Sequence, residues 1–275
     1  MRVEKTMSMR GLAELERQMR AQDKEIVQLV GRFSLMSSGQ IRRVCFQEIV
    51  NPRSRQRRAN EALTRLTEQE VLARLVRRIG GQRSGSEGYS YRLGPYGQRL
   101  VQIWAGQTPE RGRLRPEPGE RFVRHRLAVS ELYVRLVEAA RVDRGDDLEV
   151  IAYEAEPDSW RPFDGYGATE RMLKPDAFLR LGVGELEHWW FCELDLGTVS
   201  RRARESQAAA YRAYWRSGAA GEVMPRVLWV TPNDLVSRVA STAINPAGNA
   251  SALFVVTTLD RAIEAAATAP PQVRP

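Results

Sequence analysis

Two short acidic motifs in the second half of the chain interrupt runs of apolar residues. Asp176 follows a lysine and a proline in KPDAFL, and Glu193 and Asp195 lie within WWFCELDL. Strand side chains alternate between faces, so Glu193 and Asp195 are predicted to share one face. By the same rule Lys174 and Asp176 share a face of the preceding strand.

These carboxylates are costly to bury unless a cation, a base or hydrogen bonds neutralise them. We therefore expect Asp176, Glu193 and Asp195 to form a three-carboxylate cluster. Such a cluster suits Mg²⁺ or Mn²⁺, hard cations that take oxygen ligands and keep several waters. The metal would activate a water and stabilise the charge that builds on a phosphoryl group in transfer.

The segments around these motifs alternate between helical and strand patterns. Periodicity predicts helices over 120–141 and 200–215, strands over 148–155, 173–182, 188–197 and 226–231, and a polar, glycine-bearing loop over 157–171. The order α-β-β-β-α-β favours a mixed α/β sheet covered by helices. A last helix over 260–269 precedes a tail, 269–275, that we expect to be disordered.

The first half of the chain has a different pattern, in which three helices precede a hairpin. Apolar spacing predicts helices over 23–33, 39–46 and 52–66, the second capped by Ser37 or Ser38 and the third opened by Pro52. The third helix carries side chains of the kinds that bind phosphates and base edges in a major groove, namely Arg53, Arg55, Gln56, Arg57, Arg58, Asn60 and Arg65.

A glycine- and serine-rich tip follows between two predicted strands, 71–78 and 89–94, and a helix over 95–104 closes the segment. This hairpin would be the wing of a winged helix-turn-helix, with Arg77, Arg78 and Arg83 on it. Helix, helix, basic helix and basic hairpin, in that order, indicate a domain that binds double-stranded DNA. The alternative is a winged helix that binds protein.

The charge distribution supports two domains. Residues 1–118 hold 23 basic and 12 acidic residues, a net charge of +11, whereas residues 119–275 hold 19 and 22, a net charge of −3. We predict an amphipathic arm (1–21), a winged helix-turn-helix (22–105), a proline- and arginine-rich linker (106–118) and a mixed-sheet domain (119–268).

Composition excludes several classes of protein. Two cysteines without CxxC spacing and two distant histidines do not form a disulfide framework or a compact zinc motif. The sequence contains no long apolar run, and its first residues are charged, so we expect a cytoplasmic protein that is not attached to a membrane.

These motifs together resemble two known families. Pro175–Asp176, the strand with Glu193 and Asp195, and the Q-x-x-x-Y spacing of Gln207 and Tyr211 resemble the PD-(D/E)XK, or restriction-endonuclease-like, nuclease superfamily and its RecB-like branch. Over residues 22–260 the chain resembles the replication-relaxation family of plasmids and other mobile elements. The resemblance implies a role in plasmid replication, DNA relaxation or mobilisation.

The resemblance also assigns roles to further residues. It implies that Gln207 positions water or phosphate and that Glu131, on the helix 120–141, is an extra metal ligand. The superfamily has a lysine two residues after its glutamate, where this chain has Asp195. That lysine orients the attacking water. Lys174 is a candidate substitute, and Arg201, Arg202 or Arg204 on the following helix could supply positive charge.

Three functions remain open. The first is a DNA-binding protein that nicks DNA with Mg²⁺ or Mn²⁺, using Asp176, Glu193, Asp195, Gln207 and Lys174. The second is an inactive DNA-binding accessory that recruits a relaxase, replication protein or translocase. The third is a winged-helix transcriptional regulator with a ligand-sensing second domain. The expected partners are double-stranded DNA, such proteins, and a second copy of the chain in a homodimer.

Overall fold

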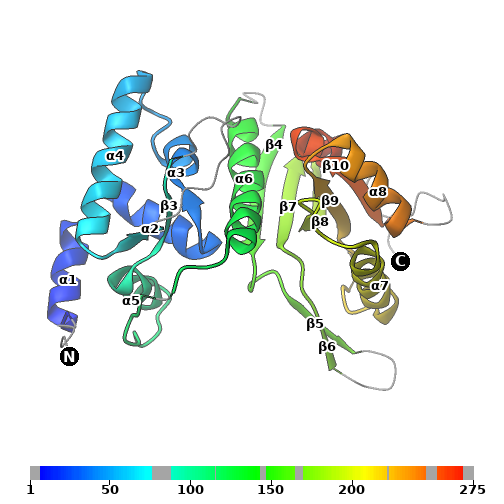
Figure 1. Cartoon of the computed structure of the whole chain (residues 1–275), viewed down its shortest axis with the longest axis horizontal. Helices are drawn as coiled ribbons and strands as arrows, with labels where there is room; N and C mark the ends of the chain where they lie inside the picture. The colour runs from blue at the N-terminus through cyan, green and yellow to red at the C-terminus, as the bar shows by residue number, and fades with distance from the viewer. Residues whose placement is uncertain are drawn as a thin grey trace. The chain divides into compact units, whose positions relative to one another are not determined.

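The computed structural model (Figure 1) describes residues 7–75, 88–114, 116–142, 147–164, 170–221, 223–245 and 253–268. The chain divides into two compact units, residues 1–134 and 135–275. The division falls within helix α6 (Glu120–Val142), whereas the sequence placed it earlier, in the linker 106–118.

The first turns of α6 explain this difference. Val123 and Leu127 are buried in a cluster with Leu35 and Leu75 of the first unit. The apolar side chains of this part of the helix therefore complete the core of the first unit, and the linker lies within that unit.

Helices and a small sheet make up the first unit. Its elements are α1 (Met9–Gln18), α2 (Ala21–Phe33), β1 (Met36–Ser37), α3 (Ser38–Cys45), α4 (Pro52–Glu68), β2 (Leu72–Arg74), β3 (Ser90–Leu93) and α5 (Pro95–Trp104). The strands form an antiparallel sheet in the order β1-β3-β2. The predicted helices and both predicted hairpin strands are present, and β1 is an addition. The predicted wing tip lies outside the described residues.

Local capping explains where α3 and α4 begin. The Ser37 hydroxyl accepts a hydrogen bond from the Gln40 amide (3.2 Å), and the Gln40 side chain accepts one from the Ser37 amide (2.9 Å). Asn51 caps α4 through the Ser54 amide (3.0 Å), and Pro52 occupies its first turn, where a missing N–H costs nothing. Asn51 and Pro52 therefore define where α4 begins.

The second unit is built around a mixed five-stranded sheet. Its elements are β4 (Leu148–Ala155), β5 (Arg161–Asp164), β6 (Glu170–Leu173), β7 (Ala177–Val183), β8 (Leu186–Leu194), α7 (Arg201–Ser217), β9 (Arg226–Thr231), α8 (Asp234–Ile244), β10 (Phe254–Thr258), η1 (Leu259–Arg261) and α9 (Ala262–Thr268). The strand order is β10-β9-β8-β7-β4, parallel from β10 to β8 and antiparallel from β8 to β4. The predicted mixed α/β sheet is confirmed.

Two local predictions were wrong. The segment 157–171 is not only a loop, because β5 pairs with β6 in a separate two-stranded ribbon that extends away from the main sheet in Figure 1. Strand β7 begins at Ala177 rather than at 173, so Lys174 and Asp176 precede the strand and lie in the bend after the ribbon. Pro175, which cannot donate a backbone hydrogen bond, separates ribbon from strand.

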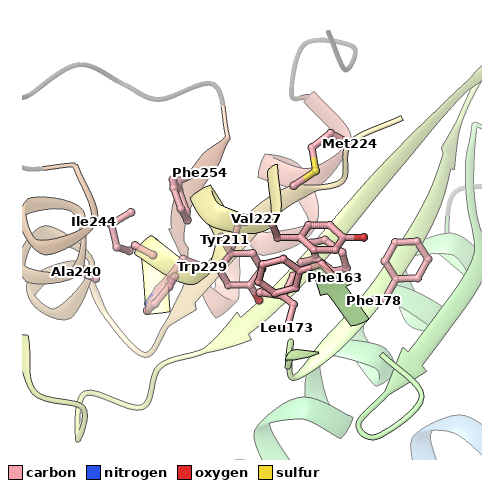
Figure 2. Close-up of a cluster of buried hydrophobic side chains, with 13 residues drawn as sticks. Phe163, Leu173, Phe178, Tyr211, Met224, Val227, Trp229, Ala240, Ile244 and Phe254 are labelled. Atoms are coloured by element: carbon pink, nitrogen blue, oxygen red, sulfur yellow. The ribbon is translucent and has the colours of Figure 1, made fainter. Parts of the chain in front are cut away.

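An aromatic core holds α7 on the sheet (Figure 2). The fully buried rings of Tyr211 and Phe191 lie with centroids 5.8 Å apart, and Phe254 meets Tyr211 edge to face. Phe163 and Leu173 of the ribbon join the same cluster. Packing on several sides leaves the Tyr211 ring little rotational freedom, so its hydroxyl has a fixed direction.

Candidate functional site

The exposed face of α4 carries only part of the predicted set of arginines. Arg53, Arg57 and Arg58 are exposed, and so is Asn60, which accepts a hydrogen bond from the Gln56 side chain (2.8 Å). Arg57 also lies 3.8 Å from Glu61, an exposed pair that contributes little to stability. The guanidinium groups at the start of α4 can therefore reach an external anion.

Arg55 and Arg65 are instead bound within the first unit. Arg55 donates to the carbonyl oxygens of Ile49 (2.8 Å) and Gln47 (3.2 Å), and so fixes the turn before α4. Arg65 forms an ion pair with the buried Asp23 of α2 (2.6 Å). Both were predicted to contact DNA, and the contacts that they make hold α4 in place. Arg77, Arg78 and Arg83 lie outside the described residues.

In the second unit, Glu193 lies at the centre of a buried polar cluster. The carboxylate accepts hydrogen bonds from the Gln207 amide and the Tyr211 hydroxyl, one on each oxygen. Gln207 and Tyr211 are four residues apart on α7 and therefore lie on the same helical face. The structure thus brings together three of the predicted site residues.

Burial and nearby negative charge raise the pKa of Glu193 well above its usual value. Desolvation is the largest cause, and repulsion from Asp176 is the next. The hydrogen bonds from Tyr211 and Gln207 act in the opposite direction because they favour the ionised form, and Glu156 raises the pKa further. The surroundings of Glu193 therefore disfavour its ionised form.

Asp195 faces the same helix, as the alternation along the strand predicts, but has different partners. Arg204 donates from Nε (2.5 Å) and from Nη2 (3.1 Å) to the two carboxylate oxygens, and both side chains are almost fully buried. The Gly197 amide (2.9 Å) and the Trp229 indole (3.3 Å) donate further hydrogen bonds. Asp195 is therefore neutralised by a protein cation and fully hydrogen-bonded.

Sheet register aligns Asp176 with Glu193. Ala177 pairs with Cys192, so the preceding residue, Asp176, comes beside Glu193. An Asp176 oxygen accepts a hydrogen bond from the Leu194 amide (2.7 Å). Lys174 is exposed, and its ammonium lies 4.5 Å from the centre of the Trp160 ring. Lys174 thus contacts an aromatic ring.

Sequence reasoning missed one contributor to this site, Glu156, and named Arg204 only as one of three arginines that could supply positive charge. Ala155 pairs with Ala177, so Glu156 comes beside Asp176, and its amide donates to the Asp176 carbonyl (3.2 Å). Glu156, Asp176 and Glu193 therefore follow one another across the ends of β4, β7 and β8, and we call them the acidic row. Arg204 lies three residues before Gln207 on the same helical face and is the arginine of the three that pairs with Asp195.

The remaining predicted ligand, Glu131, is bound in the first unit. Its carboxylate forms an ion pair with Arg43 (2.8 Å) and accepts a hydrogen bond from Gln40 (3.1 Å). These contacts hold α6 against α3. The resemblance had assigned Glu131 to the metal.

The carboxylates do not form the three-ligand site that the sequence predicted. Within the described parts of the chain, no three His, Cys, Asp or Glu side chains are arranged to hold a metal ion. Asp195 is paired with Arg204, and Glu193 is held on both oxygens by α7. The donor atoms are of the kind that Mg²⁺ prefers, but their arrangement does not fit it. Metal binding and cleavage at these residues stay predictions.

Comparison with known proteins identifies the family. None of the curated proteins compared with the chain matches it. The family model described as Replication-relaxation matches residues 27–227, which is more than half of the 275-residue chain and spans most of both units. No helix in the described segments is long and apolar enough to cross a membrane. On this match, the chain belongs to the Replication-relaxation family.

Proposed function

We propose that this chain is a double-stranded DNA-binding protein of plasmid or mobile-element replication, relaxation or mobilisation. The first unit would act as a winged helix-turn-helix, with α4 in the major groove. The second unit would be a PD-(D/E)XK-like fold that serves as a non-catalytic scaffold for a relaxase, replication protein or translocase. The observation that carries the proposal is the exposed arginine group at the start of α4.

The topology of the first unit supports α4 as the recognition helix. Helices α2, α3 and α4 precede the strands β2 and β3, and the sheet order β1-β3-β2 places the returning strand in the centre. In a helix-turn-helix the recognition helix presents its N-terminal residues to base edges. Arg53, Arg57 and Arg58 occupy that part of α4, and Arg55 and Arg65 anchor it from the inner side.

The buried state of the acidic site supports a scaffold role for the second unit. Asp195 occupies the position of the lysine in the nuclease pattern, and its charge is cancelled by Arg204. Lys174, the candidate substitute, contacts Trp160. Within the described residues, no three His, Cys, Asp or Glu side chains are arranged to hold a metal ion.

A DNA-binding assay with two matched triple variants tests the proposal. Arg53→Ala/Arg57→Ala/Arg58→Ala removes three exposed arginines from α4, and Arg201→Ala/Arg202→Ala/Arg216→Ala removes three exposed arginines from α7. The net charge is the same in both. We expect the α4 variant to bind a DNA duplex about 100-fold or more weakly than the wild type. The slope of its salt dependence should fall by about 0.9 for each phosphate that is no longer neutralised.

The α7 variant provides the comparison. Affinity close to wild type in that variant would assign binding to α4. Equal reductions in the two variants would mean that binding follows net charge alone, and unchanged affinity in the α4 variant would contradict the recognition-helix assignment. Circular dichroism verifies that both variants are folded.

The second candidate function is phosphodiester cleavage, and the acidic row is the observation that favours it. Three carboxylates at neighbouring strand ends, with the pKa of Glu193 raised by Asp176, form a site with excess negative charge. Nicking of supercoiled plasmid in Mg²⁺ or Mn²⁺ tests this function. Cleavage that is lost in Asp176→Asn and Glu193→Gln would establish it. No cleavage by the wild type, or cleavage unchanged in both variants, would leave the scaffold proposal.

A further inference from the structure

A second feature of the first unit is a cavity of about 600 Å³ on the side of β2 and α5. It is lined by Thr67, Glu70, Leu72, Ala73, Arg74, Pro95, Tyr96, Arg99, Arg111, Gly112 and Leu114. We call it the α5 pocket. Its lining includes none of the exposed arginines at the start of α4, so it is separate from the proposed recognition surface.

Arg99 is the most informative residue of the α5 pocket. The side chain is 93% buried (7% exposed), and its Nη1 donates to the Met7 carbonyl (2.6 Å). Its Nη2 contacts the Met9 sulfur (3.5 Å), and its buried Nε has no hydrogen-bond partner among the described residues. No carboxylate in the described ranges pairs with this guanidinium. A buried cation without a counter-anion is costly, and a bound anion would remove that cost.

Arg74 adds a second cation to the same pocket. Its guanidinium lies 4.1 Å from the centre of the Tyr89 ring, a stacking contact that orients the planar group. Arg111 lines the pocket as well, and Glu70 is the one acidic residue among the lining side chains. The lining therefore carries a net charge of +2. Guanidinium groups match phosphate oxygens with paired donors, so the chemistry favours a phosphate over a neutral ligand.

The segment after α5 forms one wall of the pocket through close backbone packing. A Cβ at Gly112 would lie 1.9 Å from the Pro95 carbonyl oxygen, so only glycine fits there. Gln98 and Arg113 exchange hydrogen bonds: the Gln98 side chain donates to the Arg113 carbonyl (3.0 Å) and accepts from the Arg113 amide (3.3 Å). The wall at Arg111 and Gly112 is therefore held by specific contacts.

We propose that the α5 pocket binds a nucleoside phosphate, either free or as part of a DNA strand. The phosphate would be held by the arginine side chains of the lining, which are Arg74, Arg99 and Arg111. The volume is within the range of small-molecule sites and exceeds what a single inorganic ion requires. The aromatic side chain of Tyr96, on the same lining, provides a surface for the base or sugar.

Isothermal titration calorimetry on the full chain tests this proposal with three probes: inorganic phosphate, ADP and a short DNA duplex. We expect saturable binding of ADP, or of the duplex, that falls about tenfold or more in Arg74→Ala and in Arg99→Met. Arg99→Lys keeps the charge and should retain more affinity than Arg99→Met. Arg202→Ala, an exposed arginine on α7, is the control and should bind as the wild type does.

ADP and the duplex distinguish the source of the phosphate, and inorganic phosphate measures how much of the affinity comes from the phosphate group alone. Arginine-dependent binding of ADP identifies a free nucleotide site, whereas a dependence seen only with the duplex identifies a DNA backbone contact. If neither ADP nor the duplex responds to Arg74→Ala and Arg99→Met, the proposal is overturned. The α4 triple variant should leave ADP binding unchanged, which separates this site from the recognition surface.

Gly112→Val provides a test without any change of charge. The added side chain would displace the wall from Pro95 and open the pocket. We expect ADP binding to fall about tenfold or more while the far-ultraviolet circular dichroism of the protein is retained. Wild-type affinity in Gly112→Val and in both arginine variants would place the bound phosphate elsewhere.

Discussion

Helices α4 and α7 have the same length and the same number of arginines, but the side chains on their buried faces differ in chemical character. Each has 17 residues, five of them arginine, and begins at a side-chain cap. The inner face of α4 is aliphatic, with Ala59, Leu63 and Leu66 buried. That of α7 is polar and aromatic, with Arg204 and Tyr211 buried against the sheet. Arginine content alone therefore does not distinguish the two helices.

The partners of the buried residues account for the difference. Helix α4 contributes one partly buried ion pair, Arg65 with Asp23, and Arg55 donates hydrogen bonds to two backbone carbonyl oxygens. Arg53, Arg57 and Arg58 are exposed. Helix α7 uses its inner polar groups to satisfy two buried carboxylates, Glu193 and Asp195. The outward charge of α4 is available to a polyanion, whereas the inner polar face of α7 is committed to the sheet.

The largest expected effect on stability is at Arg204. Arg204→Met would leave the Asp195 side chain buried and without its cation, so we expect a loss of about 3–5 kcal/mol in the free energy of unfolding. The matched variant Arg65→Met should lose less, because Arg65 is about one third exposed and water already screens its ion pair with Asp23. Asp23 also keeps the hydrogen bond that it accepts from the Arg20 amide (3.1 Å). Urea unfolding followed by circular dichroism measures both.

A charge-free double variant separates the two contributions to the loss at Arg204. Asp195→Asn/Arg204→Met removes both charges, and its unfolding free energy should lie above that of Arg204→Met. A double variant as unstable as Arg204→Met would mean that packing, rather than the unpaired carboxylate, causes the loss. Tryptophan fluorescence follows this transition, since Trp104 is the one tryptophan of six outside the second unit.

A smaller effect is expected at the Tyr211 hydroxyl. Tyr211→Phe keeps the ring in the aromatic core but removes the donor to Glu193, so we expect a loss of about 1–3 kcal/mol in unfolding free energy. Tyr214→Phe is the matched control, because Tyr214 is buried in the same cluster and its hydroxyl makes no hydrogen bond among the described residues. Equal losses in both variants would show that the hydrogen bond to Glu193 contributes nothing.

The sequence predicted the strongly patterned elements of the fold. Helix α5 and strands β4 and β9 have the expected bounds, because prolines, glycines or polar residues border continuous apolar patterns. The ribbon β5–β6 was missed because most of its side chains are exposed, and only Phe163 and Leu173 are buried in the core. A short ribbon with one inward residue per strand has no detectable alternation.

Part of the candidate site was also predictable, because it lies on a strand with regular alternation. Alternation along one strand correctly placed Glu193 and Asp195 on a common face, toward α7. The cation that neutralises Asp195 is Arg204, which lies nine residues further along the chain. The residue beside Asp176 is Glu156, and the register of β4 on β7 places it there. Local periodicity contains neither, because both arise from tertiary packing.

The smallest expected effect concerns the pH dependence of stability. The pKa of Glu193 is raised in the folded chain from its usual 4.5, so above pH 4.5 the folded state binds the proton more tightly than the unfolded state. The unfolding free energy should therefore fall as pH rises toward the raised pKa, by at most about 1.4 kcal/mol per pH unit for this one proton.

Glu193→Gln cannot titrate, so its slope from pH 4.5 upward should be shallower than that of the wild type. Glu68→Gln, at an exposed position of α4, is the matched control and should keep the wild-type slope. Chemical denaturation at several pH values measures these slopes. Equal slopes for the wild type and Glu193→Gln would contradict a raised pKa of Glu193. They would also remove one difference between the buried polar face of α7 and the exposed charged face of α4.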